Sequence, residues 1–439
     1  MIKVSVIMPC LNVVKYIKSC IDSVICQTLK DIEILIIDAG STDGTLEILS
    51  EYEKKDPRIH IIHSKIKSYG YQMDTGISLA AGEYVGIVET DDFIQPDMFE
   101  VLYEEAAREH ADYVKGTSEG FYQSSAGIEW RFPILPWSGL KEKNVVVPRK
   151  TPEIFLNDNF LWNGIYRTEF LKKIKFNETP GAAFQDIGAL FQIASRAEKG
   201  VYVDHLVYNY RQDNLGASSY NQKSLLYVAE EYKNIEQFLP DLSQEWEDVY
   251  YLKMGRLCID RFLFMARSGQ YWYESEKSIE ELGKKLLLAA KERKDYLEGG
   301  LDWSQLQMFM KNPYLLYESL QEEYLDKKRN LFVVLDKVKG KKVYIFGAGK
   351  YGMFLHMFLH LHNIEVIAFC DNNSRRWGQE MQTIPVISPN EAAVGEPDAF
   401  YVAAVKGHAR EITEQLLQLG IEKNRITYYD SEISMYLLI

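Results

Sequence analysis

The first third of the chain alternates between strand patterns and helix patterns, and this alternation constrains the fold more than any other feature. Val4 to Met8 is a short, largely apolar run with β-branched residues. Ile32 to Ile37 is almost entirely apolar, as expected of a strand buried on both faces. Between these runs, Val13 to Cys26 has helical spacing. Repeated βα units of this kind predict an α/β fold with a doubly wound, mostly parallel sheet.

The same alternation continues along the chain. A helix is predicted from about Thr42, and further elements follow as strands at 58–63, 83–88 and 112–115 and helices at 72–81 and 96–109. Ligands of such sheets bind beyond the carboxyl ends of the strands. Two acidic segments follow predicted strands and are therefore the places to search for a site: Asp38-Ala39-Gly40-Ser41 and Glu89-Thr90-Asp91-Asp92.

Two later changes of pattern predict the domain organisation. The segment 118–215 is irregular and aromatic, whereas 224–338 has the apolar spacing of helices. A charged stretch at 336–342 then leads into a new strand at 343–346. We expect a first α/β domain at 1–220, a helical region at 221–338 and a small α/β domain at 339–439.

Composition excludes several classes of protein. The chain has 50 Lys and Arg against 63 Asp and Glu, a net charge of −13 and no basic stripe, so a nucleic-acid partner is not expected. Its five cysteines form no C-x-x-C pair, which predicts reduced thiols rather than disulfides or a zinc site. No run of about 18 apolar residues occurs. These features predict a cytoplasmic protein and leave peripheral association with the inner face of a membrane open.

The two acidic segments together predict a site that binds a divalent metal and a phosphate-bearing ligand. Asp38 ends one strand before a glycine-containing turn that opens a helix, whose backbone N–H groups could face an anion. Glu89, Asp91 and Asp92 follow another strand, and carboxylates there could hold Mg²⁺ or Mn²⁺ while the metal binds a diphosphate. Taken singly, each acid could equally be a helix cap or a solvated turn residue. Their placement at one sheet edge favours the metal site.

Four motifs resemble those of family 2 glycosyltransferases, which have the GT-A fold, and they occur in the family's order over about residues 1–215. The opening strand and turn are matched by Val-Ser-Val-Ile-Met-Pro9-Cys-Leu-Asn12, and the nucleotide-base motif by Ile-Ile-Asp38-Ala-Gly-Ser41-Thr-Asp43-Gly44-Thr. The DxD-type metal motif is matched by Glu89-Thr-Asp91-Asp92. The acceptor-side segment with the catalytic base is matched by Trp162-Asn-Gly-Ile-Tyr166-Arg and Phe184-Gln185-Asp186-Ile-Gly.

This resemblance implies a nucleotide-diphosphate sugar as donor, with UDP-sugar favoured, a divalent metal, and inversion at the anomeric carbon. It also implies roles for single residues. Pro9, Asp38 and Ser41 would contact the base and ribose, Asp91 would bind the metal with Glu89 and Asp92 as further candidates, and Asp186 would be the general base.

The sequence departs from the family's pattern at several of these positions. Leu11, beside Asn12, stands where the family often has Tyr, and Ala39 where Asp or Asn is usual. Asp74 stands where Asn is common, and Glu89 replaces the first Asp of the DxD pattern. Leu11, Asn12 and Asp74 are nevertheless assigned to the donor side. The departure at Glu89 leaves open whether one or two acids hold the metal.

The reaction itself supports Asp186 and leaves the acceptor site less defined. Displacing a nucleoside diphosphate requires a base for the acceptor hydroxyl, and a lone carboxylate far from the metal acids suits that role. Trp130, Trp162 and Tyr166 could stack on a sugar, although aromatic residues are more often packing residues. Gln185, next to the base, is a further candidate for contact with the acceptor. The Gln-x-x-Arg-Trp signature of processive synthases is absent, which favours the addition of one sugar.

The C-terminal part contains a second nucleotide-like motif. Gly347, Gly349 and Gly352 form a G-x-G-x-x-G after a strand, and Asp371 follows the next strand. This context is that of a dinucleotide-binding fingerprint, and the segment resembles Rossmann-like domains of bacterial sugar-modifying enzymes. Three roles of this segment remain open: a degenerate scaffold or oligomerisation module, nucleotide-sugar binding, and an NAD(P)-dependent oxidoreductase. NAD(P) itself is not expected as a cofactor.

The sequence thus predicts a glycosyltransferase that moves one sugar to a hydroxyl of a glycan or lipid-linked acceptor, in bacterial surface polysaccharide synthesis. Two alternatives from other classes are an NAD(P)-dependent sugar oxidoreductase and a non-catalytic nucleotide-sugar-binding protein.

Overall fold

The structure is a computed structural model that describes residues 1–123, 129–134, 144–214, 216–217, 220–221, 223–269, 271, 273–404 and 407–429. The chain divides into two compact units. The first comprises Met1–Phe121, Pro133–Phe262 and Tyr271–Leu316, and the second comprises Tyr122–Phe132, Leu263–Gln270 and Tyr317–Ile439.

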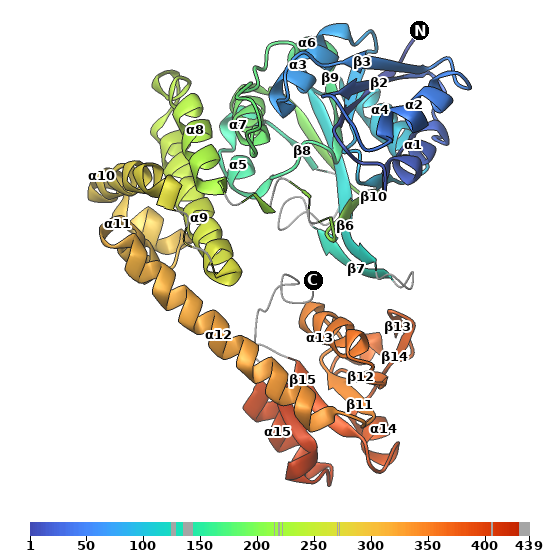
Figure 1. Cartoon of the computed structure of the whole chain (residues 1–439), viewed down its shortest axis with the longest axis vertical. Helices are drawn as coiled ribbons and strands as arrows, with labels where there is room; N and C mark the ends of the chain where they lie inside the picture. Colours follow the sequence, from blue (N-terminus) through green and yellow to red (C-terminus); the bar gives the residue numbers. More distant parts are fainter. Residues whose placement is uncertain are drawn as a thin grey trace. The chain divides into compact units, whose positions relative to one another are not determined.

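The larger sheet is built mainly from the first unit (Figure 1). Its strands in the described ranges are β1 (Val4–Cys10), β2 (Ile32–Asp38), β3 (Ile59–His63), β4 (Tyr84–Ile87), β5 (Phe93–Ile94), β6 (Tyr113–Gln123), β7 (Glu129–Ile134), β8 (Asn144–Val146), β9 (Gly164–Arg167) and β10 (Gly200–Arg211). The order is β3-β2-β1-β4-β9-β6-β10-β5, with β7 beside β6 and β8 beside β10. Strands β1 to β4 pair in parallel, as do β6 and β10, whereas β9 is antiparallel to both its neighbours. The predicted mostly parallel α/β sheet is confirmed.

Helices cover both faces of this sheet, which explains the nearly continuous apolar runs. They are α1 (Ile17–Ile25), α2 (Thr45–Glu53), α3 (Tyr69–Leu79), α4 (Met98–Glu109), α5 (Glu153–Asn157), α6 (Thr168–Leu171) and α7 (Asp186–Arg196). Because successive strand side chains point to opposite faces, Val6 of β1 packs in a core with α1 and α4, whereas Ile7 packs in one with α3 and α7. This two-sided burial fixes the carboxyl ends of β1, β2 and β4 at one edge.

A group of helices follows, as the sequence predicts (Figure 1). They are α8 (Ser224–Glu236), α9 (Gln244–Ser268), α10 (Glu276–Gly300), α11 (Trp303–Lys311) and α12 (Pro313–Val338). Local signals set their ends: the Asp302 side chain accepts hydrogen bonds from Ser304 N and Gln305 N at the start of α11, and Pro313 opens α12. None of the described helices is long and apolar enough to cross a membrane.

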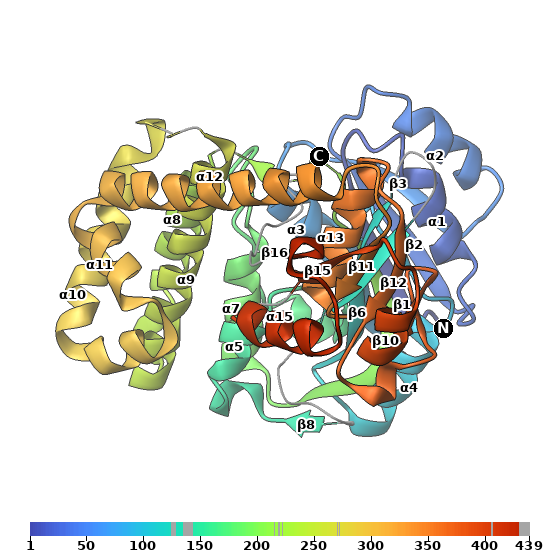
Figure 2. The ribbon, with the colours of Figure 1, turned by 90° about the horizontal axis from the view of Figure 1, so that it is seen from below.

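The second unit contains a smaller sheet (Figure 2). Its described strands are β11 (Val343–Phe346), β12 (Val366–Cys370), β13 (Glu380–Met381), β14 (Ile384–Ile387), β15 (Phe400–Ala404) and β16 (Ile426–Tyr429), and its later helices are α13 (Lys350–Leu361), α14 (Pro389–Val394) and α15 (Ala409–Gln418). The order is β13-β14-β12-β11-β15-β16, parallel except for β13. Val343 faces a core with α13, and Tyr344 faces one with α14 and α15.

Parts of α12 and of the β6–β7 region also belong to the second unit. Leu331, Val334 and Val338 of α12 belong to the same core as β11 and α13, so this core begins before the domain boundary predicted at residue 338/339. The end of β6 and the start of β7 also belong here, because Trp130 packs with Met353 and Met357 of α13. The boundaries predicted from sequence stay predictions.

Candidate active site

The strand order brings the two predicted acidic segments to one edge of the larger sheet. β1 lies between β2 and β4, so Asp38 and Glu89 follow strands on either side of it. Cys10 at the end of β1 pairs with Asp38 at the end of β2. On the other side, the Thr90 hydroxyl donates to the Pro9 carbonyl at 2.9 Å. The carboxyl ends of three parallel strands therefore form one continuous site.

Asp38 stabilises the turn after β2 through hydrogen bonds to its side chain. It is completely buried, and its carboxylate accepts from Gly40 N at 2.8 Å, from Ser41 N at 3.1 Å and from Ser41 Oγ at 2.5 Å. Because both oxygens are engaged and covered, this side chain does not line the surface on which a base or ribose could lie. The predicted direct contact is corrected to an indirect one, in which Asp38 fixes the shape of the turn.

The exposed rim of the donor side comes instead from the loop after β1 and from the turn itself. Leu11 is 41% exposed, and Asn12 has a left-handed backbone with φ of 54°. Asn12 joins the two loops, because its Oδ1 accepts from Thr42 N at 2.8 Å and its N–H donates to Ser41 Oγ at 2.9 Å. The side chain of Lys67 lies beside exposed Gly40, which gives this rim a cation that the sequence pattern did not reveal.

Asp91 and Glu89 are the carboxylates that could hold a metal. Both are partly exposed. Asp91 Oδ2 accepts from Asn214 Nδ2 at 2.7 Å, and Glu89 Oε1 accepts from the Tyr69 hydroxyl at 2.9 Å. The second oxygen of each has no hydrogen-bond partner among the described residues. No group of three metal-ligating side chains gathers in the described ranges, so a cation here would complete its shell with water and ligand oxygens, as Mg²⁺ does.

Asp92, the third predicted metal candidate, is part of the scaffold. It is completely buried, Oδ2 accepts from the Tyr208 hydroxyl at 2.9 Å, and Oδ1 accepts from Arg211 N at 2.7 Å. These bonds tie the loop after β4 to β10. Because Asp92 is completely buried and each of its oxygens already accepts a hydrogen bond, we assign it to the scaffold rather than to the metal.

Arg211 is a site residue that sequence reasoning missed. It ends β10, and its Nε donates to the Asp91 carbonyl at 2.8 Å while Nη1 pairs with Asp213 at 3.2 Å. Its guanidinium lies 4.7 Å from the ring centroid of Tyr16 and 4.6 Å from that of Phe121. The run Tyr-Asn-Tyr-Arg211 carries no recognisable motif, and only the pairing of β10 with β5 brings it to the metal acids.

Asp186 lies at the first turn of α7 and faces the same site. Burial, with the charges of Asp91 and Asp186, raises the pKa of Glu89 to about 8, and the hydrogen bond from the Tyr69 hydroxyl opposes the shift. Burial also raises the pKa of Asp186, against its own N–H, Lys253 and the N–H of Ile187. The structure thus brings both Asp91 and Asp186 within electrostatic reach of Glu89, although Asp186 is distant in sequence.

Gln185 positions the start of α7. It is 2% exposed, and its Oε1 accepts from Gly70 N at 2.9 Å and from the Ser68 hydroxyl at 3.2 Å. Its Nε2 donates to the Thr179 carbonyl at 2.9 Å. The amide therefore joins α7 to the start of α3, which corrects the predicted contact with an acceptor.

Asp74 faces the acceptor-side segment. Burial raises the pKa of its carboxyl to about 6, whereas Lys175 and the N–H of Phe176 lower it and Glu178 raises it. These neighbours all lie on the segment that leads to α7. Asp74 thus has its electrostatic partners on that segment, and its place on the donor side stays a prediction.

The aromatic residues predicted for the acceptor are packing residues in this structure. Trp162 is 6% exposed and stacks on Tyr208, with ring centroids 4.2 Å apart. Tyr166 is completely buried, and its hydroxyl donates to the Leu161 carbonyl at 2.9 Å. Trp130 is buried against α13. None of the three presents a ring to a sugar, which corrects the stacking roles.

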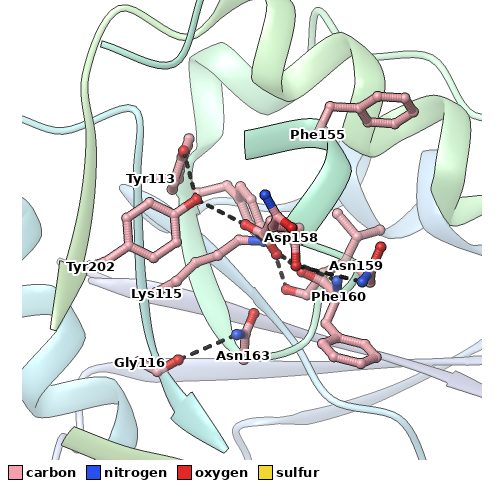
Figure 3. A network of polar contacts seen from close by, with 12 residues as sticks. Tyr113, Lys115, Gly116, Phe155, Asp158, Asn159, Phe160, Asn163 and Tyr202 are labelled. Atoms are coloured by element: carbon pink, nitrogen blue, oxygen red, sulfur yellow. Dashed lines mark hydrogen bonds and ion pairs between the residues drawn. The ribbon is translucent and has the colours of Figure 1, made fainter. Parts of the chain in front are cut away.

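A buried polar network joins Lys115, Asp158 and Tyr202 (Figure 3). Lys115 Nζ pairs with Asp158 Oδ2 at 2.7 Å, and the Tyr202 hydroxyl donates to the same oxygen at 2.9 Å. Lys253 of α9 donates to the carbonyls of Phe155 and Asp158. Burial lowers the pKa of Lys253 to about 7, whereas Asp158 and Asp186 raise it. The helical region thereby places a cation near the predicted base.

Comparisons with known proteins identify the family. The glycosyl transferase family 2 profile matches residues 5–175. Glycosyltransferase GlyG of Streptococcus pneumoniae is 30% identical over 220 residues, which are 48% of this chain and 70% of that protein. The chain belongs to glycosyltransferase family 2. The uncharacterized glycosyltransferase EpsJ of Bacillus subtilis is 32% identical over 216 residues, and the match spans 61% of that protein.

Solved structures agree on the fold. The glycosyltransferase resembles S. aureus TarS 1-349, crystallised in complex with UDP-GlcNAc, with a TM-score of 0.56 and 22% identity. The likeness covers 74% of this chain and 92% of that one. At this identity it shows the GT-A fold alone.

The glycine-rich motif of the glycosyltransferase's second unit forms the predicted strand–loop–helix. Gly347 has φ of +112°, and a Cβ on Gly352 would lie 2.0 Å from the Gly347 carbonyl oxygen, so both positions require glycine. However, Asp371 accepts from Ala348 N at 2.9 Å and from Asn373 N at 2.8 Å, which engages the carboxylate that a ribose would need. A profile described as "C2185-like, N-terminal" matches residues 339–427.

Proposed function

We propose that this glycosyltransferase transfers a single sugar from a nucleotide-diphosphate sugar, with a UDP-sugar as donor, to a hydroxyl of a glycan or lipid-linked acceptor. The observation that carries the proposal is the convergence of Glu89, Asp91 and Asp186 at the strand ends beside the rim of Leu11 and Asn12. TarS, which shares the fold, was crystallised with UDP-GlcNAc, and this supports a UDP-sugar.

The donor would lie across the edge of the larger sheet. The nucleoside would rest on Leu11, Asn12 and Gly40, which are exposed where the loops after β1 and β2 meet. Its diphosphate would lie toward Asp91. Because the described site is rich in carboxylates, a diphosphate needs a compensating positive charge there.

Mg²⁺ or Mn²⁺ held by Asp91 and Glu89 fits that need. Each residue has one carboxylate oxygen engaged by a neighbour and one without a partner in the described ranges. Such a cation would neutralise charge on the diphosphate leaving group. Arg211 contributes to the same edge by fixing the Asp91 backbone.

Asp186 would act as the general base in an inverting displacement. The acceptor oxygen forms a bond to the anomeric carbon as the bond from that carbon to the diphosphate oxygen breaks, and the acceptor's proton passes to Asp186. A raised pKa suits this role, because a more basic carboxylate accepts a proton more readily. The bacterial relatives EpsJ and GlyG are glycosyltransferases, which supports sugar transfer, and we include bacterial surface polysaccharide synthesis in the proposal.

A donor screen tests the proposal. Thermal unfolding of the whole protein would be measured with UDP-, GDP- and dTDP-sugars, each with Mn²⁺ and with EDTA, because a ligand of the native state raises stability by mass action. We expect stabilisation by UDP-sugars that requires Mn²⁺, together with slow release of UDP. Equal stabilisation in EDTA would contradict the proposed need for a metal. Stabilisation by GDP- or dTDP-sugars alone would contradict the proposed UDP-sugar donor.

A further inference from the structure

The helix that carries Asp186 begins without a cap of its own. The first N–H groups of an α-helix lack partners inside the helix, and a side chain at the N-cap usually supplies one. Here the N-cap is Gln185, whose side chain makes no such bond because it reaches α3 instead. Ile187 N donates to the Phe184 carbonyl at 3.2 Å, whereas the next N–H, that of Gly188, finds its partner on another helix.

Glu231 of α8 supplies that partner. Its Oε1 accepts from Gly188 N at 2.9 Å, and its Oε2 accepts from Asn177 Nδ2 at 2.9 Å. Asn177 in turn accepts from the Thr179 N–H and hydroxyl through Oδ1. One side chain, only 1% exposed, thus joins both ends of the segment that carries Asp186.

The contact between Glu231 and α7 is closely fitted. A Cβ on Gly188 would lie 2.2 Å from Glu231 Oε1, closer than atoms can approach without movement. Glycine at this position therefore allows the carboxylate to reach the helix N-terminus. An acceptor placed there also interacts favourably with the helix dipole.

The surroundings of the segment support a constrained geometry. Phe184 has a left-handed backbone with φ of 65°, which non-glycine residues seldom adopt, and the guanidinium of Arg261 on α9 lies 5.3 Å from its ring centroid. Burial raises the pKa of Glu231 to about 8, whereas Asn177 and Gly188 N–H lower it. The charge of Asp186 raises the pKa of Glu231 as well, so the two groups are near each other.

We propose that Glu231 is a positioning residue for sugar transfer: it caps α7 from the helical region and holds Asp186 in the orientation in which it accepts the proton. The proposal rests on the proposed role of Asp186 as the base. In this proposal the helical region contributes to catalysis through its contact with α7.

The test separates positioning from stability through kcat and donor affinity. Glu231→Ala, Glu231→Gln and Asp186→Asn would be compared with the wild type for UDP release from the UDP-sugar that the wild type hydrolyses fastest. UDP affinity would be titrated with Mn²⁺, and thermal unfolding would monitor the fold. Glu236→Ala is the matched control, because it removes a carboxylate of α8 that pairs with Lys285.

We expect Glu231→Ala to lose about 10-fold or more in kcat at unchanged UDP affinity, because small misplacements of reacting groups cost rate steeply. Glu231→Gln keeps an oxygen for Gly188 N–H and should retain most of the rate. Glu236→Ala should retain the wild-type rate. A Glu231→Ala variant that folds, binds UDP and keeps the wild-type kcat would overturn the proposal.

Gly188→Ala alone tests the same contact from the side of α7, and its kcat is informative whether or not the Glu231 variants fold. Its methyl group should displace Glu231 and lower kcat, and combining it with Glu231→Ala should cost less than the sum of the two single changes. Additive losses would contradict a shared contact. Wild-type turnover in Asp186→Asn would overturn both the base role of Asp186 and the positioning role of Glu231. Loss of turnover in Asp186→Asn together with full activity in Glu231→Ala would overturn only the positioning role.

Discussion

The acids of the site differ in burial, and burial separates their roles. Asp38 and Asp92 are completely buried and have both oxygens bonded, so they shape loops. Glu89, Asp91 and Asp186 are partly exposed, and the charges of Asp91 and Asp186 act on Glu89. All five could be identified as candidates from the sequence, because each lies within a recognisable motif. The sequence could not separate the two groups, since a motif records residue type and spacing but not which oxygen already has a partner.

The metal role of Asp91 predicts a specific loss. Asp91→Asn should reduce Mn²⁺-dependent affinity for UDP by at least about 10–100-fold, the effect of losing even an outer partner of a metal site. Its thermal unfolding should stay close to that of the wild type, because Asn can still accept from Asn214 Nδ2. Asp92→Asn should instead lower the unfolding temperature, because it disturbs bonds with Tyr208 and Arg211. Calorimetric titration and thermal unfolding distinguish these outcomes, and unchanged UDP affinity in Asp91→Asn would contradict the metal role.

The raised pKa of Asp186 predicts the pH dependence of turnover. A base acts only when deprotonated, so kcat should rise with pH through the pKa of Asp186 and level off above it. Because burial raises that pKa above its ordinary value of 3.8, the acid limb should lie at higher pH than for an exposed aspartate. UDP release measured across pH at saturating donor tests this. An acid limb at or below the ordinary pH range of an aspartate would contradict the buried setting.

At the scale of elements, the βα alternation predicted the central strands and helices because their patterns are local. It ended β6 at residue 115, whereas the strand continues to Gln123 and is followed by β7. The end of β6 pairs with β10 (Gly200–Arg211), which is distant in sequence. Trp130 of β7 packs against α13, which is more distant still. Pairings of this kind leave no periodic signal in the segment itself. For the same reason Trp130 was interpreted as an acceptor aromatic rather than a packing residue.

The packing of Trp130 on α13 predicts a stability effect. Trp130 is 1% exposed, and truncation to Ala should destabilise the second unit by about 3–5 kcal/mol, as for buried aromatic residues generally. Trp130→Phe is the matched control. The Trp130 Nε1 has no hydrogen-bond partner among the described residues, so losing that N–H costs nothing while most of the ring contact is kept. Thermal unfolding compares them, and equal losses in both variants would contradict this explanation.

At the scale of the whole molecule, the proposed reaction requires groups from the sheet edge, the acceptor-side segment and the helical region. The family resemblance supplied Asp186 and the metal acids, because their motifs lie in the matched half of the chain. It did not supply Glu231 or Lys253, which are separated from Asp186 by β10 and belong to helices with ordinary amphipathic patterns. Only the folded chain shows that these helices contact the segment before α7.

The central claim is that Asp186 accepts the proton of the attacking hydroxyl, and turnover by Asp186→Asn at saturating donor tests it most directly. Asn has nearly the same size and hydrogen-bonding reach but cannot accept a proton. We predict that UDP release falls by about 10²–10⁴-fold while the affinity for UDP with Mn²⁺ stays at the wild-type level. Turnover within a few-fold of the wild type would show that another group or another mechanism carries out the transfer.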